Sequence, residues 1–173
     1  EQVAASERYT EKLHKAIEQA IAAAMESRTA AHLSIGNAQA NFAKNRRPQA
    51  DGPVDHRVRL LIARGDDGLV RGAAFMYACH CTTPGSNAEV SGDWAGLSAA
   101  RLEQLHAGSV WLPIIGCGAD ANPEPRGTYD MAQQHAAELV SAIDAKIAEP
   151  QQFTPLAESA FPVAHFGYAG LAP

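Results

Sequence analysis

The chain has 173 residues, of which 46% are hydrophobic and 19% are charged. These values are typical of one globular domain that buries about two-thirds of the surface its unfolded chain exposes. The formal net charge of −5 argues against a general nucleic-acid-binding protein, because such proteins are usually basic. No apolar run reaches the roughly 20 residues that a membrane span needs.

The first part of the chain predicts a helix, a strand and a loop. Residues 9–28 are expected to be helical because apolar residues recur at every fourth position. These residues are Leu13, Ile17, Ile21 and Met25. Residues 30–40 alternate between apolar and polar side chains, which predicts a strand. Residues 42–53 are polar and end in Gly52-Pro53, so we expect a loop closed by a turn.

A β-hairpin is predicted over residues 57–79, with Asp66-Asp67-Gly68 as its turn. Its second arm is almost entirely apolar, which indicates an inner strand covered on both faces. This arm runs into the triplet Cys79-His80-Cys81. After a loop rich in Gly, Ser and Pro, residues 94–106 predict a second helix.

The next strand is predicted at residues 110–115, and Pro113 favours a position near a sheet edge or a bulge. The strand ends in the sequence Gly-Cys-Gly-Ala-Asp-Ala-Asn-Pro at 116–123. Thr128 or Asp130 can cap a last helix that runs to Ile147. The regular pattern stops at Pro150. The sequence therefore predicts a single α/β domain at 1–149, a mixed β-sheet flanked by helices, and an irregular aromatic, Pro- and Gly-rich tail at 150–173.

Three predicted strand or loop ends carry polar residues that could take part in catalysis or metal binding. They are His80, Asp93, and Asp120 with Asn122. In open α/β sheets, ligands bind at the ends of the strands. An imidazole, a carboxylate and an amide could hold a metal-bound water and orient a carbonyl. Sequence spacing alone does not show that these residues meet.

Five segments, in this order along the chain, resemble the N-terminal catalytic domain of neutral/alkaline ceramidase-like hydrolases. They are residues 42–47, 51–55, 77–80, 92–96 and 116–123. The resemblance extends from about Tyr9 to Ile147, and it implies a zinc ion bound by His80. It also implies that the position of the family's catalytic serine is held by Asn122, and that the family's other zinc ligands lie outside this chain.

The resulting hypothesis is a zinc-dependent hydrolase of a small-molecule or lipid-like amide or ester. His80 is the expected metal ligand, and Asp120 and Asn122 are expected to orient water or substrate. The residues expected to shape the substrate pocket are Asn45, Arg47, Asp93 and Gly118. Asn45 and Arg47 could equally belong to a solvated basic loop. Local substitutes for the missing zinc ligands are Cys79, Cys81, Asp93, Asp120 or His165.

Two alternatives stay open. The chain starts at Glu1 without a methionine, so we expect either a removed leader or a longer gene product. It could then be a non-catalytic fragment or subunit whose site is completed by another segment or chain. The second alternative is a thiol-based redox or acyl-transfer module that uses Cys117 or Cys81. Free thiols in a reducing compartment are the simplest interpretation of three cysteines.

Overall fold

The computed structural model describes residues 2–47, 52–86 and 89–156. The chain divides into two compact units, residues 1–30 and 31–173. The first contains helix α1 (Gln2–Glu26), so the predicted helix at 9–28 is confirmed, with an earlier start and an earlier end. Among the described residues, no helix combines the length and the hydropathy that crossing a membrane requires.

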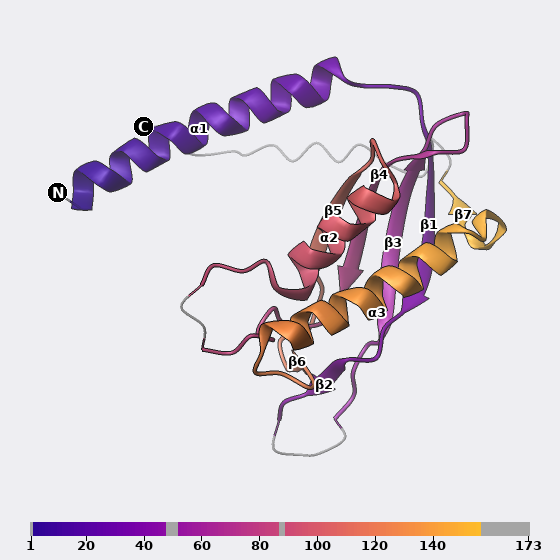
Figure 1. Cartoon of the computed structure of the whole chain (residues 1–173). Coiled ribbons are helices and arrows are strands. Elements are labelled where there is room, and N and C mark those ends of the chain that lie inside the picture. The colour runs from indigo at the N-terminus through magenta and orange to yellow at the C-terminus, as the bar shows by residue number, and fades with distance from the viewer. Residues whose placement is uncertain (1, 48–51, 87–88, 157–173) are drawn as a thin grey trace, which may run out of the picture. The chain divides into compact units, whose positions relative to one another are not determined.

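The second unit is built on a five-stranded sheet with the order β5-β4-β3-β1-β7 (Figure 1). Its strands are β1 (His32–Gln39), β3 (Arg57–Arg64), β4 (Val70–Tyr77), β5 (Val110–Ile115) and β7 (Thr154–Pro155). Strands β4 and β5 pair in parallel, and the other neighbours pair antiparallel. The predicted mixed α/β sheet and the hairpin are therefore confirmed. Pro113 lies in β5 at the sheet edge, as predicted.

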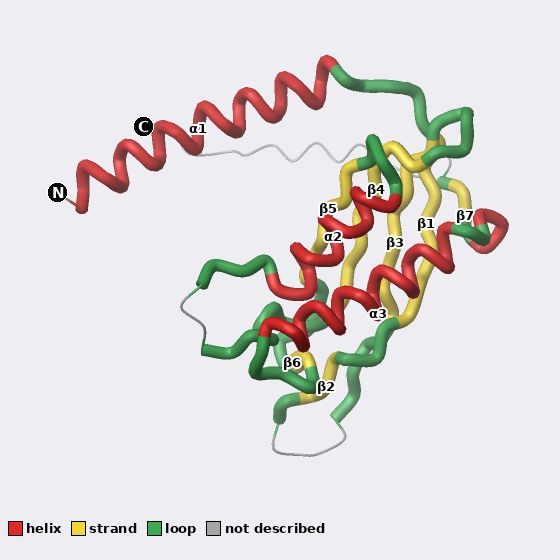
Figure 2. The backbone as a smooth tube through the Cα atoms, viewed as in Figure 1, coloured by secondary structure: helices red, strands yellow, loops and turns green. Residues whose placement is uncertain are grey.

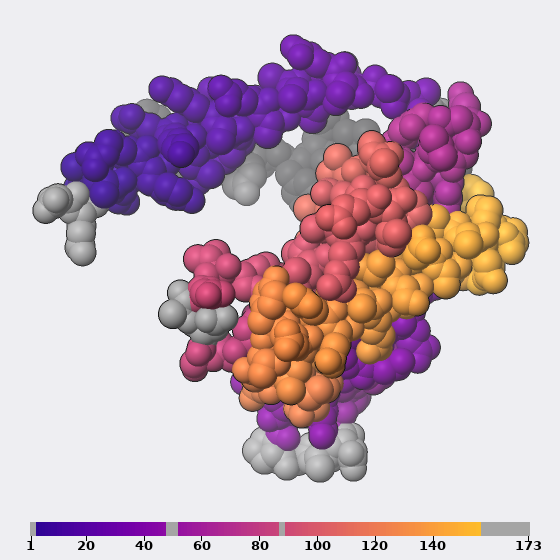
Figure 3. All heavy atoms as spheres, viewed as in Figure 1, coloured from indigo at the N-terminus to yellow at the C-terminus, as the bar shows by residue number. Residues whose placement is uncertain are grey.

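Helices α2 (Asp93–Leu105) and α3 (Tyr129–Ile147) lie side by side on one face of this sheet (Figures 2 and 3). The predicted cap of α3 is confirmed, because the Thr128 hydroxyl accepts a hydrogen bond from the Met131 amide at 3.3 Å. The helices and the sheet enclose the core. Its largest fully buried members include Trp94, Tyr77, Phe75, Ile62 and Leu102.

The other face of the sheet is only partly covered. Phe75 and Tyr77 of β4 are fully buried on the helix side, but Ala74 and Met76 on the opposite side are half-buried. Large apolar side chains on that side are 37–68% exposed, namely Leu33, Ile35, Leu61, Val110 and Leu112. The prediction of an inner strand is confirmed for β4, whereas the prediction of cover on both of its faces is wrong for the described residues.

A second, two-stranded antiparallel sheet pairs β2 (Ala43–Asn45) with β6 (Ala121–Pro123), beyond the ends of β4 and β5 (Figure 1). We call it the β2–β6 ribbon. The sequence predicted a loop at β2, because three residues are too few to show a period of two. Of the expected tail, residues 150–156 form the 3-10 helix η1 (Pro150–Gln152) and β7. Residues 157–173 lie outside the described residues.

Candidate functional site

The segment after β5 folds back over the end of β4. The Gly116 amide donates to the Tyr77 carbonyl at 2.9 Å, and the His80 amide donates to the Ala121 carbonyl at 2.9 Å. A tight turn is closed by the Ala121 amide, which donates to the Gly118 carbonyl at 2.9 Å. We call residues 116–122 the corner. The two neighbouring parallel strands thus bring His80 to the same place as Asp120 and Asn122.

Gly118 is buried where the corner meets the exit of β4. A Cβ atom at this position would lie 2.4 Å from the Ala78 carbonyl carbon and 2.6 Å from the Cys79 nitrogen. Real Cβ atoms do not approach backbone atoms so closely, so only glycine fits. Gly118 was predicted to contact substrate, and its contact here is with the protein's own backbone.

The side chain of His80 contacts the corner directly. Its Nε2 lies 3.3 Å from the Ala119 carbonyl oxygen. A carbonyl oxygen only accepts, so this hydrogen bond assigns the proton to Nε2 and leaves the lone pair on Nδ1. Metal-binding histidines commonly donate their second ring nitrogen to a carbonyl in this way. The Trp94 indole also donates to the His80 carbonyl at 3.0 Å, which fixes the backbone at this residue.

Asp120 and Asn45 meet across the end of the ribbon. The side-chain Nδ2 of Asn45 donates to Asp120 Oδ2 at 3.0 Å and to the Pro53 carbonyl oxygen at 3.2 Å. The Asp120 carbonyl accepts from the Arg46 amide at 2.7 Å. Asn122 faces Lys44 in the ribbon register. Two predicted site residues are therefore in contact, although no hydrogen bond among the described residues joins the His80 ring to Asp120 or Asn122.

Asp93 is 2% exposed and stands at the first position of α2, in the left-handed region with φ 51°. Its Oδ2 accepts from the Thr83 amide at 2.7 Å, and its Oδ1 accepts from the Trp94 amide at 2.6 Å. Both carboxylate oxygens thus bind backbone N–H groups, which ties the loop after His80 to the start of α2. Arg47 is exposed, and its amide donates to Asn45 Oδ1 at 3.0 Å.

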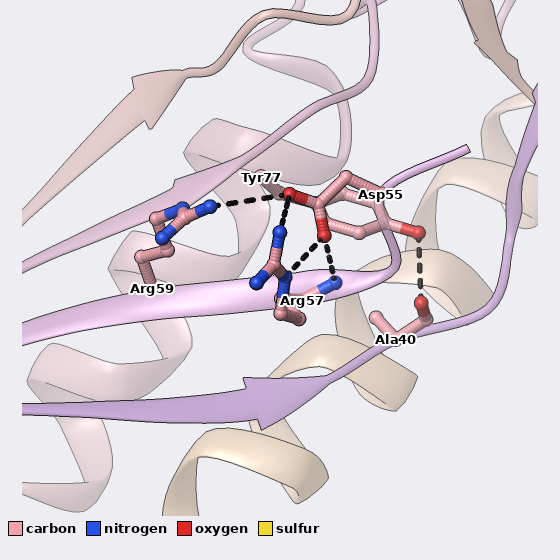
Figure 4. A network of polar contacts seen from close by, with 5 residues as sticks. All are labelled: Ala40, Asp55, Arg57, Arg59 and Tyr77. Atoms are coloured by element: carbon pink, nitrogen blue, oxygen red, sulfur yellow. Dashed lines mark hydrogen bonds and ion pairs between the residues drawn. The ribbon is translucent and has the colours of Figure 1, made fainter. Parts of the chain in front are cut away.

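Tyr77 holds the chain that enters the ribbon. Its buried hydroxyl donates to the Ala40 carbonyl at 2.9 Å (Figure 4) and accepts from the Ala43 amide at 3.1 Å. Burial raises the pKa of Tyr77 above its ordinary value, so this hydroxyl keeps its proton. Sequence reasoning did not single out Tyr77. The available signal was a tyrosine at the end of an inner strand, whose hydroxyl needs a partner once it is buried.

The described residues contain no group of three or more His, Cys, Asp or Glu side chains that could hold a metal ion. Cys79 is fully buried, and burial raises the pKa of its thiol to about 12, so it is not a thiolate at neutral pH. His165 lies outside the described residues. A catalytic zinc ion normally takes three protein ligands. The described residues therefore do not form a zinc site by themselves, and zinc stays a prediction.

Comparisons with known proteins give a fold. No protein-family model matches the chain, and no curated protein matches its sequence. Solved structures similar to it include two ceramidases. One is a ceramidase complexed with C2, with 17% identity and a TM-score of 0.61. The other is the neutral ceramidase from Pseudomonas aeruginosa, with 18% identity and a TM-score of 0.55.

Each alignment covers 71% of this chain and 23% of the ceramidase chain. The protein thus spans about a quarter of the length of either ceramidase. At these identities the likeness concerns the backbone fold, and the chain has the fold of part of a ceramidase.

Proposed function

We propose that this protein is a ceramidase-like hydrolase that cleaves an amide or ester bond in a small-molecule or lipid-like substrate. One observation carries the proposal. The His80 ring contacts Ala119, one residue before Asp120, at a strand-end corner within a ceramidase-like fold. Strand ends of α/β sheets are the usual place for ligands.

The side chains at the corner suit direct attack by water. The carboxamide of Asn122 is not a nucleophile toward carbonyl carbon, so a covalent acyl intermediate on this residue is excluded. In the proposed reaction a water oxygen bonds to the acyl carbon, the carbon–nitrogen or carbon–oxygen bond breaks, and the leaving group takes up a proton. The free Nδ1 of His80 is the nitrogen that would bind zinc, the carboxylate of Asp120 can accept the proton of the water, and Asn122 can donate to the carbonyl oxygen.

The carboxylate of Asp120 is oriented by its hydrogen bond from Asn45 at 3.0 Å. In the proposal this carboxylate positions the water, while Asn45 and Arg47 border the substrate. Zinc bound by His80 remains part of the proposal. It requires ligands from beyond the described residues or from another chain, because the described residues supply no group of three ligands.

The test measures hydrolysis and metal content together. We expect the purified protein to cleave a chromogenic N-acyl amide or ester, and His80→Ala and Asn122→Ala to lower kcat/KM by about 100-fold or more each. The matched control is His32→Ala, since the His32 side chain is 79% exposed and, among the residues that the structure describes, its ring pairs with Asp66. The zinc content, measured by elemental mass spectrometry, should fall in His80→Ala but not in Asn122→Ala. Unchanged turnover in His80→Ala would contradict the proposal.

The second candidate, a non-catalytic fragment or subunit of a larger ceramidase-like protein, is favoured by the apolar sheet face. Leu112 and Val110 are 58% and 68% exposed there, and contiguous exposed apolar surface often marks an interaction site. In this alternative, another segment or chain covers this face and completes the site. Light scattering combined with the hydrolysis assay distinguishes the two functions, because an inactive monomer or an obligate assembly supports the second.

A further inference from the structure

The two faces of the β2–β6 ribbon differ in chemistry. Ala43, Ala121 and Pro123 are buried. The intervening residues Lys44 and Asn122 are register partners, so their side chains share the opposite, outer face. Two hydrogen bonds extend the ladder beyond the strands, since the Arg46 amide donates to Asp120 and the Glu124 amide donates to Phe42, both at 2.7 Å. Arg46 and Glu124 line the same hollow as Lys44 and Asn122.

This outer face is hollowed and cationic. A cavity of about 190 Å³ is lined by Lys44, Asn45, Arg46, Asn122, Glu124 and Arg126. Three of these side chains are cations and one is a carboxylate, which gives a local formal charge of +2 (3 − 1). The whole chain has a net charge of −5. The hollow therefore carries the sign opposite to that of the chain as a whole.

The cations of this hollow are available to a ligand. Within the described part of the chain, Lys44 and Arg126 form no ion pair. Arg46 is held in place, because its Nε and one terminal nitrogen lie 3.3 and 3.1 Å from the Ala119 carbonyl oxygen. The other terminal nitrogen is left for a further acceptor. A positioned guanidinium beside two unpaired cations is suited to a phosphate or a carboxylate, which accept several charge-assisted hydrogen bonds.

We propose that this hollow binds an anionic group, a phosphate or a carboxylate, of the substrate. The inference rests on the proposed function, because Asn122 lines the hollow and is also a proposed site residue. Its size agrees with a head group, since whole drug-sized ligands occupy about 300 Å³ or more. The anion would place the scissile bond of the same molecule beside Asn122 and Asp120. The substrate class would then be an anionic amide or ester.

The experiment measures binding, so its outcome does not depend on turnover. Hexyl phosphate, hexanoate and the neutral hexanol are titrated into the full chain by ligand-observed NMR. We expect at least one of the two anions to bind about tenfold or more tightly than hexanol, and to bind more weakly as salt rises, because salt screens charge–charge attraction. Binding of hexyl phosphate alone identifies a phosphate site, and binding of both identifies a general anion site.

Charge variants locate the binding. Lys44→Gln and Arg126→Gln should each weaken anion binding about fivefold or more, and Glu124→Gln should strengthen it, because it removes a negative charge from the lining of the hollow. Lys12→Gln, on the exposed surface of α1, is the matched control and should have no effect. Equal affinity for hexanol and the anions, or binding that ignores Lys44→Gln and Arg126→Gln, would overturn the inference. These binding measurements can be interpreted even if the protein does not hydrolyse the proposed substrates.

Discussion

Gly118 approaches Ala78 so closely that a Cβ atom on Gly118 would lie 2.4 Å from the Ala78 carbonyl carbon. This contact presses the corner onto the exit of β4, two residues before His80. The Ala119 carbonyl that contacts the His80 ring follows directly after Gly118. The position of the imidazole at the corner therefore depends on the absence of a side chain at residue 118.

Gly118→Ala is expected to destabilise the protein by about 1–3 kcal/mol, because the clash is with backbone atoms that have no rotamer to escape into. Denaturant unfolding measures this loss. Gly96→Ala in α2 is the matched control, because a Cβ there meets no atom within 4 Å. It should stabilise the helix by about 0.5–1 kcal/mol. Equal effects of the two substitutions would show that the Gly118 contact does not hold the corner.

Asp93→Asn is expected to destabilise the protein by about 1–3 kcal/mol. The carboxylate accepts from two backbone amides, those of Thr83 and Trp94, whereas a carboxamide offers only one oxygen. One buried N–H group then loses its partner. Thermal unfolding measures the loss of stability. Faster hydrogen exchange at the Thr83 amide would show that the lost hydrogen bond is the one to this residue.

The control for Asp93→Asn is Asp130→Asn, at an exposed carboxylate in the first turn of α3. It should change the free energy of unfolding by no more than about 0.5 kcal/mol. If both variants lose the same stability, the loss comes from a general effect of helix-terminal charge and not from the two hydrogen bonds of Asp93.

Long periodic segments were predictable from the sequence because their burial repeats with the geometry of the element. The helix that ends at Ile147 and the hairpin that contains β3 are examples, and Thr128 or Asp130 was predicted as the cap from residue type. The β2–β6 ribbon was not predictable, because its three-residue strands are 75 or more positions apart, as Asn45 and Asp120 illustrate. No local pattern encodes such a pairing.

Sequence spacing did not show that His80 meets the corner, and it is the parallel pairing of β4 with β5 that brings the two together. The contacts within the corner arise only in the folded chain. Asp93 illustrates the difference, since a carboxylate before a helix is a plausible ligand by sequence, but its burial and its two backbone partners are properties of the folded loop. The roles proposed for Asp120, Asn122, Asn45 and Arg47 stay predictions.

Cys79 is expected to resist alkylation in the native protein at pH 8. Its side chain is buried, and burial, with a smaller contribution from the nearby Cys81 and Asp93, raises the pKa of its thiol to about 12. Only the thiolate reacts readily. Cys117 is exposed and should be labelled. Iodoacetamide labelling followed by peptide mass spectrometry checks both cysteines.

The same labelling examines the thiol-based alternative. If the protein hydrolyses its substrate equally well after Cys117 is alkylated, then that thiol takes no part in the reaction. Denatured protein provides the control, because all three cysteines should then react. Rapid labelling of Cys79 in the native state would contradict the buried position of this residue.

Asp55→Asn is expected to lower the free energy of unfolding at pH 7 by up to about 1 kcal/mol, the range of partly exposed ion pairs. Asp55 binds Arg57 at 2.8 Å and Arg59 at 3.4 Å (Figure 4), and its hydrogen bonds with Arg57 hold the pKa of Asp55 well below its usual value of 3.8. A lowered pKa in the folded state stabilises the protein above the unfolded-state pKa. This stability is lost as the pH falls through the folded-state pKa.

The difference between the wild type and Asp55→Asn should therefore be constant from neutral pH down to about pH 5 and should shrink only below about pH 4. Urea unfolding at several pH values measures it. In an Arg57→Gln background the cost of Asp55→Asn should be smaller, because the main partner of the carboxylate is gone. A difference that changes between pH 6 and 8, or the same cost with and without Arg57, would mean that the ion pair is not the source of the stability.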